Sequence, residues 1–337
     1  MNFTPNNSST DAGIRRGILT FANPRLRDWQ WPMVEIRGQR PGPHLCVMAG
    51  MHVNEVSSIE AAVRLQRRIA PAQLRGSIAI LPILNLPAVP ARSQYVCPID
   101  GKNINFSFPG RAEGSFSEAL ADAILGEWAA DAEVLIDLHG GDLCENVARF
   151  SICQMTGDRG HDDAALALAR CFDAEIIAAL DPAEMAAPGR ACTGRTRAGR
   201  RAPGRTRAGR RAVMAEAGAN GILDPVSTAY HLNGVLNVMT LLGMIEGPPI
   251  PPTRDQVVTG RYLWIETPRP GLLHARAEPG MRVAAGQILA RILDVFGDEI
   301  AQIRAPATGL VLWRINHGMA GEGEKVFGLG LPVEVLG

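Results

Sequence analysis

Two histidines and one glutamate in this sequence have the side chains of a hydrolytic metal site. Only two residues separate His52 from Glu55, so both side chains can reach one metal ion. A second motif, Asp137 to Gly141, supplies another imidazole at His139. A catalytic zinc ion typically takes three protein ligands of these kinds and leaves a fourth position to water. The pattern predicts one zinc ion per chain, held by His52, Glu55 and His139.

Each of these residues also has an interpretation without a metal. A lone histidine in an apolar segment is more often a hydrogen-bonded core residue, and Glu55 would suit the first turn of a helix. Both ligand groups, however, follow apolar runs, at residues 44–49 and 133–137, that are typical of buried strands. In an open α/β sheet, side chains gather in a crevice at the carboxyl ends of the strands. Their joint position at two strand ends favours the metal site.

A zinc-activated water also needs a proton acceptor, and a glutamate that is not a metal ligand commonly serves. Glu216 is the candidate. It ends the strand-like run 212–215 and precedes a glycine-containing turn at 217–221, which would let the backbone approach a substrate. Considered alone, Glu216 could equally be an exposed acid at the end of a strand.

Strand-like and helix-like segments alternate through the part of the chain that carries these motifs. Strands are expected at 46–49, 77–83 and 134–137, and helices at about 57–69, 116–130 and 163–171. This alternation predicts an α/β fold in which helices flank a sheet.

The proline-rich segment 247–253 is the clearest linker, because consecutive prolines cannot continue a helix or a central strand. Beyond it, short apolar-polar alternations separated by glycine and proline turns predict a small all-β module. The patterns at 280–289 and 305–311 resemble the barrel-sandwich fold of biotinyl and lipoyl domains, but this segment has no lysine before Lys325. We therefore interpret it as a structural appendage. The expected division is a partly disordered leader at 1–30, a catalytic domain at 31–250 and a β-rich domain at 255–337.

Composition limits the cellular setting and the partners. The chain has 337 residues, is 46% hydrophobic, and balances 34 basic against 34 acidic residues. A substantial core is expected, without a general attraction to nucleic acid or to anionic membranes. The six cysteines form no C-x-x-C pair, the first residues show no secretory signal, and the apolar stretch 235–245 is too short to span a bilayer. These features favour a cytoplasmic protein.

An arginine-rich tandem repeat is the least ordinary feature. Residues 194–202 recur at 204–212, and Arg190 to Arg211 contains nine arginines and no acid. One interpretation is a patch that binds nucleic acid or phosphate, with an affinity that falls steeply with salt. The other is a passive duplication in a surface loop at 190–212, where insertions cost little. The absence of interleaved aromatic residues favours the duplication, so nucleic acid is not an expected partner.

Four motifs together resemble the succinylglutamate desuccinylase/aspartoacylase family, which is related to zinc carboxypeptidases. They are Gly50 to Glu55, Asp100 to Gly110, Asp137 to Gly140 and Glu216 to Gly218, and the resemblance runs over about residues 40–335. It implies a three-layer α/β/α catalytic domain with a mixed sheet, of zinc-carboxypeptidase type, followed by the β-rich domain. It also implies that Glu216 activates a water for attack on an amide carbonyl and then protonates the leaving amine. We further expect Asp137 to orient a ligand imidazole.

The substrate-binding residues depart from the family pattern. Phe106 stands where the family usually has an arginine after Asn105, and Tyr95 aligns with the family's other substrate arginine. Neither ring replaces a bidentate arginine on a carboxylate. Arg92 is three residues from Tyr95 and could substitute, and Asn105 retains its hydrogen-bonding amide. We therefore expect Asn105, Arg92, Tyr95 and Phe106 to contact an N-acyl amine, or an N-acyl amino acid held in another orientation.

The resulting hypothesis is a zinc-dependent amidohydrolase that removes a small acyl group from an amino acid or amine, a small-molecule partner. Two alternatives remain open. One is a catalytically impaired metal-binding protein of the same fold that acts through interactions, and the other is a zinc carboxypeptidase that acts on a short peptide. A homo-oligomer is compatible with the sequence.

Overall fold

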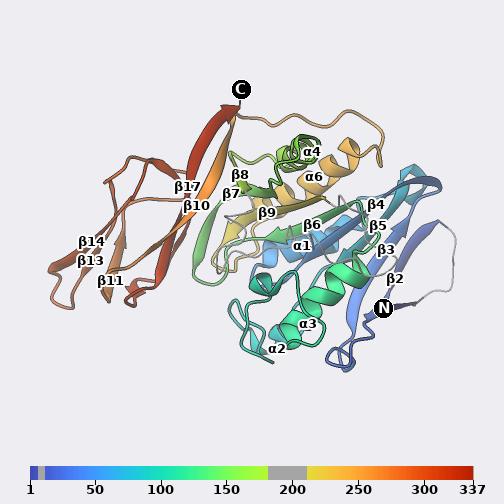
Figure 1. Cartoon of the computed structure of the whole chain (residues 1–337), viewed down its shortest axis with the longest axis horizontal. Coiled ribbons are helices and arrows are strands. Elements are labelled where there is room, and N and C mark those ends of the chain that lie inside the picture. Colours follow the sequence, from blue (N-terminus) through green and yellow to red (C-terminus); the bar gives the residue numbers. More distant parts are fainter. Residues whose placement is uncertain (7–11, 181–210, 337) are drawn as a thin grey trace.

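The computed structural model describes residues 1–6, 12–180 and 211–336 (Figure 1). The helices are α1 (Val56–Leu65), α2 (Ala88–Ala91), α3 (Phe116–Ala123), α4 (Arg159–Arg170) and α6 (Pro225–Leu241). The strands of the amino-terminal two thirds are β1 (Asn2–Pro5), β2 (Gly13–Thr20), β3 (Trp31–Arg37), β4 (Arg40–Ala49), β5 (Arg75–Leu81), β6 (Val134–His139), β7 (Glu145–Gln154), β8 (Ile176–Leu180) and β9 (Arg211–Ala219). The remaining strands are β10 (Gln256–Glu266), β11 (Gly271–Ala275), β12 (Arg282–Val283), β13 (Ile288–Leu293), β14 (Glu299–Arg304), β15 (Gly309–Ile315), β16 (Met319–Ala320) and β17 (Lys325–Leu336).

A mixed sheet is the centre of the fold. In the described part of the chain it has 13 strands in the order β1-β2-β3-β5-β4-β6-β9-β7-β8-β10-β17-β15-β12. The central strands β5, β4, β6 and β9 are parallel neighbours, so their carboxyl ends lie at one edge. The residues after β4, at the end of β6 and within β9 therefore meet there.

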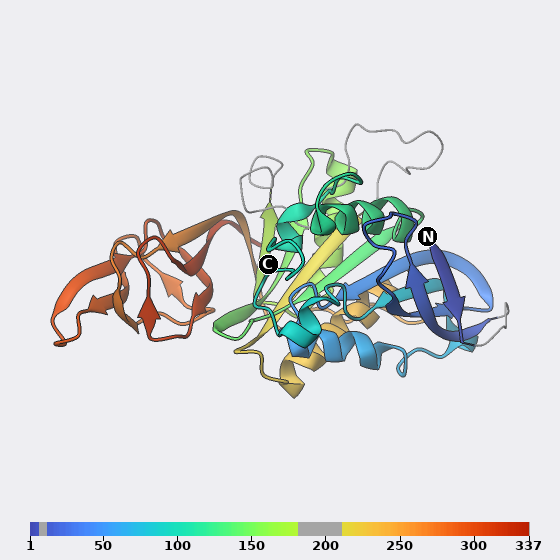
Figure 2. The same cartoon turned by 90° about the horizontal axis from the view of Figure 1, so that it is seen from below.

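Alternate residues of the central strands pack against different helical layers. On β4, Leu45 and Val47 belong to the core that also contains buried residues of α1, α4 and α6, whereas Cys46 and Met48 belong to the core formed with α3. The two-residue period of a strand produces this division. Figure 2 shows α3 on one face of the sheet and α1 and α6 on the other. The flanked α/β sheet that the alternation predicted is thus present.

The carboxyl-terminal strands are continuous with the central sheet. β10 pairs in parallel with β8, and β15 pairs antiparallel with β7. Because β17 joins β10 to β15, the strands β7, β8, β10, β17 and β15 close into a ring. A separate four-stranded sheet, β14-β13-β11-β16, lies beyond the ring and projects from the amino-terminal part of the molecule (Figure 2).

Two of the expected divisions differ from this arrangement. The segment 1–30, expected to be a leader, contains β1 and β2, which extend the sheet beyond β3 through backbone pairing. The expected boundary after residue 250 lies in a segment without regular structure, but hydrogen bonds of the sheet cross it. This linker is also tied to α6, because the Asn237 amide donates to the carbonyl of Ile250 and accepts from its N–H.

Element ends differ from the expected ones by a few residues. The first helix ends at Leu65, and the expected helix 116–130 consists of α3 followed by a wider turn, Ile124–Trp128. α6 was not expected as a helix. It begins after Asp224, whose carboxylate accepts hydrogen bonds from the N–H groups of Val226 and Ser227, a strong helix-starting feature.

Among the helices that the structure describes, none combines the length and the apolar character needed to cross a membrane. Most of the arginine-rich repeat, expected as a loop at 190–212, lies outside the described residues, which resume at Arg211.

Candidate active site

Sharp turns at the ends of two parallel strands position the three candidate metal ligands. β4 ends at Ala49 and is followed by Gly50, which has a φ of +64 and whose added Cβ would lie 2.9 Å from the Cα of Ile83. Only glycine fits this close approach without strain. The turn carries His52 and Glu55 just ahead of α1, while His139 is the last residue of the neighbouring β6.

The ligand atoms of His52, Glu55 and His139 all lie within 4.8 Å of one another. The Glu55 carboxylate contacts both imidazoles, at 2.6 Å from His52 Nδ1 and 3.1 Å from His139 Nδ1. Burial raises the pKa of Glu55, but the two imidazoles outweigh this effect and hold it at about 2. The Glu55 Oε2 atom is buried, and its contact with His139 Nδ1 does not have hydrogen-bond geometry. A buried anionic carboxylate that contacts two imidazoles fits a bound divalent cation such as zinc.

The other ring nitrogens of both histidines face polar side chains. His52 Nε2 lies 3.1 Å from Asn103 Oδ1, and His139 Nε2 lies 3.2 Å from Asp137 Oδ2. Partners of this kind fix the ring orientation and tautomer of a metal-binding histidine. Asp137 lies beside the His139 ring, and its orienting role stays a prediction. Asn103 was not singled out from the sequence, although it lies within the 100–110 motif.

Glu216 is on β9, directly beside the metal ligands. Its register partner on the parallel strand β6 is His139, and its partner on the antiparallel strand β7 is Phe150. Burial raises the pKa of the Glu216 carboxyl well above its ordinary value, with the His139 imidazole opposing the shift. A carboxyl group in such a setting is suited to exchange protons near neutral pH.

His52, Glu55, His139 and Glu216 all open on one cavity of about 770 Å³. Three of the four residues expected to contact substrate, Tyr95, Asn105 and Phe106, also line it. The Asn105 Oδ1 atom is buried without a hydrogen-bond partner, which leaves it available to a ligand.

The structure does not bring Arg92, expected to contact substrate, to the cavity that Tyr95 lines. It ends the short helix α2 in a left-handed conformation, with a φ of 46, and its side chain is exposed. Tyr95 follows with a φ of 59, so the chain turns twice between the two positions. As a result, Arg92 is not among the described residues that line the cavity, whereas Tyr95 is.

The sequence did not indicate much of the cavity wall. Glu145, Val147, Phe150 and Ile152 come from β7, and Tyr262, Trp264, Trp313 and Lys325 come from the carboxyl-terminal strands. The latter reach the site because β10, β15 and β17 join the ring with β7 and β8. No local pattern marks such contacts, since they depend on pairing between strands far apart in the chain.

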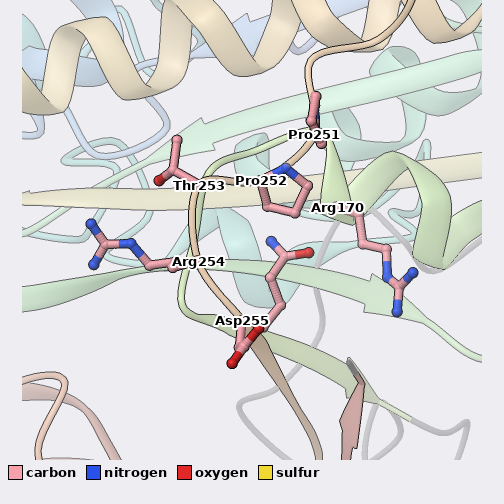
Figure 3. Close-up of a pocket in the computed structure, with 7 residues that line it drawn as sticks. Arg170, Pro251, Pro252, Thr253, Arg254 and Asp255 are labelled. Atoms are coloured by element: carbon pink, nitrogen blue, oxygen red, sulfur yellow. The ribbon is translucent and has the colours of Figure 1, made fainter.

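A smaller cavity of about 330 Å³ lies beside the linker that precedes β10 (Figure 3). Its described lining includes Arg170, Arg254 and Asp255, but none of the candidate site residues. It is separate from the chemistry considered above.

Comparison with known proteins agrees with this arrangement. Over 337 aligned positions the chain is 27% identical to the N-alpha-acetyl-L-2,4-diaminobutyric acid deacetylase of Halomonas elongata, covering 96% of this chain and 94% of the relative. The fold of this chain is similar to that of the product-bound ectoine utilization protein EutE (DoeB) of Ruegeria pomeroyi, with a TM-score of 0.80, 23% identity and 98% of each chain covered. A succinylglutamate desuccinylase from Silicibacter sp. TM1040 gives a TM-score of 0.79 at 22% identity, again over 98% of both chains.

The motifs of the metal site and Glu216 all fall within a single matched domain. Residues 41–242 match the succinylglutamate desuccinylase/aspartoacylase catalytic domain. The chain therefore belongs to the succinylglutamate desuccinylase/aspartoacylase family.

Proposed function

We propose that this protein is a zinc-dependent amidohydrolase that removes a small acyl group from the nitrogen of an amino acid or amine. The observation that carries the proposal is the joint opening of His52, Glu55, His139 and Glu216 on one cavity. The deacetylase named for the Halomonas elongata relative acts on an N-acetyl amino acid, which supports the same class of reaction here.

His52, Glu55 and His139 would hold the zinc ion. When bound, such an ion lowers the pKa of water and polarises a carbonyl oxygen. Glu216 takes the proton of the attacking water and later delivers it to the leaving amine nitrogen. Burial raises the pKa of Glu216, which favours the protonated form that delivers the proton to the amine. Asn105 donates or accepts a hydrogen bond to orient the substrate, and Tyr95 and Phe106 exclude water from one side of it.

The carboxyl-terminal module completes the cavity in this proposal. Tyr262, Trp264 and Trp313 add aromatic surface to the cavity wall. We assign this module, of barrel-sandwich type, a structural role in a cytoplasmic enzyme.

Replacing Glu216 tests the mechanism. Glu216→Gln is expected to retain one zinc ion per chain but to lower kcat for N-acyl substrates by about 10²–10⁴-fold, because the proton acceptor is removed. Metal analysis and amine release from a panel of N-acetyl and N-succinyl amino acids and amines measure both effects. Glu246→Gln makes the same chemical change at an exposed site and should match the wild type.

The panel also separates the alternatives. Retention of most turnover by Glu216→Gln would remove this residue from the mechanism. Zinc binding by the wild type without turnover of any compound would favour the impaired interaction protein, for which the replacement of two family arginines by Tyr95 and Phe106 is the supporting observation. Release of carboxyl-terminal residues from short peptides, but no deacylation, would favour the carboxypeptidase.

A further inference from the structure

The charge of the active-site cavity is unusual for an enzyme that binds acyl amino acids by a carboxylate. Its described lining contains four glutamates, one lysine and no arginine. Two glutamates have roles in the proposed reaction, Glu55 as a metal ligand and Glu216 in proton transfer. Glu324 is paired with His317, whose Nε2 lies 3.0 Å away. Glu145 is the carboxylate that remains to be explained.

Glu145 faces the cavity without a cationic partner. No arginine or lysine in the described part of the chain forms an ion pair with its carboxylate, and the Tyr95 hydroxyl is its hydrogen-bonding neighbour. Burial is the main cause that raises the pKa of Glu145 to about 7, and the nearby Glu55 charge adds to it. A buried carboxylate of this kind is costly to the fold unless a ligand compensates its charge.

The backbone around Glu145 is held rigidly. Its N–H donates to the carbonyl of Asp142 at 3.0 Å, and its carbonyl accepts from the N–H of Asn220 at 2.7 Å. As the first residue of β7 it also pairs with Ile315 of β15. A local turn and two segments distant in the sequence thus hold the backbone from which the carboxylate projects, as a recognition site requires.

An irregularity in β7 places the carboxylate and an apolar wall on one side. The register between β7 and β9 shifts between Val147 and Phe150. A shift of this kind inverts which side chains of a strand point to a given face of the sheet. The cavity is therefore lined by Glu145 and Val147 before the shift and by Phe150 and Ile152 after it. An alkyl chain could lie along this wall with its end at the carboxylate.

One aromatic ring in the same cavity already contacts a cation of the chain itself. Trp264 lies 6.3 Å from Tyr262 and 6.5 Å from Trp313, measured between ring centroids. The ammonium of Lys325 sits 3.6 Å from the centroid of Trp264. The face of this ring is therefore occupied by an ammonium group of the chain itself, and a substrate ammonium is left to the Glu145 carboxylate.

We propose that Glu145 binds a primary ammonium group on the amine part of the substrate. The preferred substrates are then amines or amino acids that carry one acylated and one free amino group, the free one several bonds from the scissile amide. This inference rests on the proposed deacylase function and deepens it by naming the substrate class. Glu145 acts as a specificity-determining residue, and Glu216 keeps its role in proton transfer.

Matched substrates that differ only in charge test the assignment. Nα-acetylornithine and Nα-acetylnorleucine have side chains of equal length, one ending in an ammonium and the other in a methyl group, and Nα-acetyl-2-aminoadipate ends in a carboxylate. N-acetyl-1,4-diaminobutane and N-pentylacetamide form the corresponding pair without an α-carboxylate. The zinc-loaded wild type should prefer the cationic member of each series by at least about tenfold in kcat/KM, as expected for a charge-assisted hydrogen bond.

Glu145→Gln should bring this ratio close to one, mainly by raising KM for the cationic compound, and Glu145→Asp should retain part of the preference. Glu324→Gln is the matched control, because its carboxylate already has a histidine partner, and should keep the wild-type ratio. An unchanged ratio in Glu145→Gln, or a wild-type preference for the neutral or anionic compounds, would overturn the assignment.

Binding of the product amines separates this inference from the proposed function. Calorimetry with ornithine and norleucine needs no turnover, and it also applies if Glu145→Gln is inactive. Wild-type protein should bind ornithine more tightly, and Glu145→Gln should lose the difference. If no compound is deacylated but this binding pattern is observed, the proposed deacylase function is refuted and the assignment of Glu145 as a cation site stands. If compounds are deacylated without any preference for charge, the deacylase function stands and the assignment of Glu145 is refuted.

Discussion

At the scale of single residues, the candidate site depends on groups that touch the metal ligands as much as on the ligands. Asp137 and Asn103 each face the ring nitrogen of a ligand histidine that points away from Glu55. Removing the charge of such a partner weakens the basicity and the orientation of the imidazole. The contact between Asp137 and His139 explains why these two residues lie only two positions apart in one motif.

Asp137→Asn is therefore expected to lower the affinity for zinc by about 10–100-fold while the fold is retained. Competition with a chromophoric chelator would measure the affinity, and circular dichroism would report the fold. Asp131→Asn, at an exposed position before β6, is the control and should bind zinc as the wild type does. Equal affinities in the two variants would show that Asp137 does not support the ligand.

At the scale of elements, local capping determines where the layers begin. Glu118, in the first turn of α3, accepts a hydrogen bond from the N–H of Ser115 at 2.9 Å. Its carboxylate also forms an ion pair with the Lys102 ammonium at 2.9 Å. The backbone hydrogen bond from Ser115 is the main cause that lowers the pKa of Glu118 to about 2, with Lys102 adding to it. A depressed pKa of an acid means that the folded state is stabilised by its charged form.

The pH dependence of stability should reveal this contribution. Glu118 stabilises the fold fully above its ordinary pKa of 4.5, and the contribution is lost as pH falls from there through about 2. Glu118→Gln should cost about 1 kcal/mol of unfolding free energy at pH 7, and the difference from the wild type should shrink below pH 4.5. Urea denaturation at pH 7, 5, 4 and 3 would measure it.

The exposed Glu113, in the preceding turn, provides the control. Glu113→Gln should change stability little at any of these pH values. A difference between Glu118→Gln and the wild type that stays constant down to pH 3 would contradict the charge-based cap.

At the scale of the whole molecule, the closed ring of strands joins the two parts of the chain. Phe150 and Ile176 of the catalytic part belong to the same hydrophobic core as Val311 and Phe327 of the carboxyl-terminal part. The ring leaves β7 and β8 with neighbours on both sides. The apparent appendage is therefore part of the fold that holds the cavity together.

Ending the chain at residue 250 would uncover this core and the edges of β7 and β8. Open apolar edges promote association, so we expect the truncated protein to be largely insoluble. Phe296→Ser, at a position that is 88% exposed far from the ring, should instead remain soluble. The soluble fraction and size-exclusion chromatography would measure both. A monomeric, zinc-binding fragment 1–250 would show that the catalytic part folds independently.

Local sequence determined the features whose parts lie close together in the chain. The spacing of His52 and Glu55, the apolar runs before them and before His139, and the run that ends at Glu216 all follow from strand ends and side-chain chemistry. Parallel pairing then brings such strand ends to one edge. For this reason, the sequence sufficed to predict the α/β class and the composition of the candidate metal site.

Tertiary structure alone decided which other residues share that site. The register that sets Glu145 against Ile315, and the ring that brings Trp264 and Lys325 to the cavity, depend on pairing between strands distant in sequence. Backbone turns excluded Arg92 although it is only three residues from Tyr95. Neighbours in the chain diverge at a turn, and distant residues converge across a sheet. The sequence therefore indicated the chemistry of the candidate metal site, and only the tertiary structure decided the charge of the cavity around it.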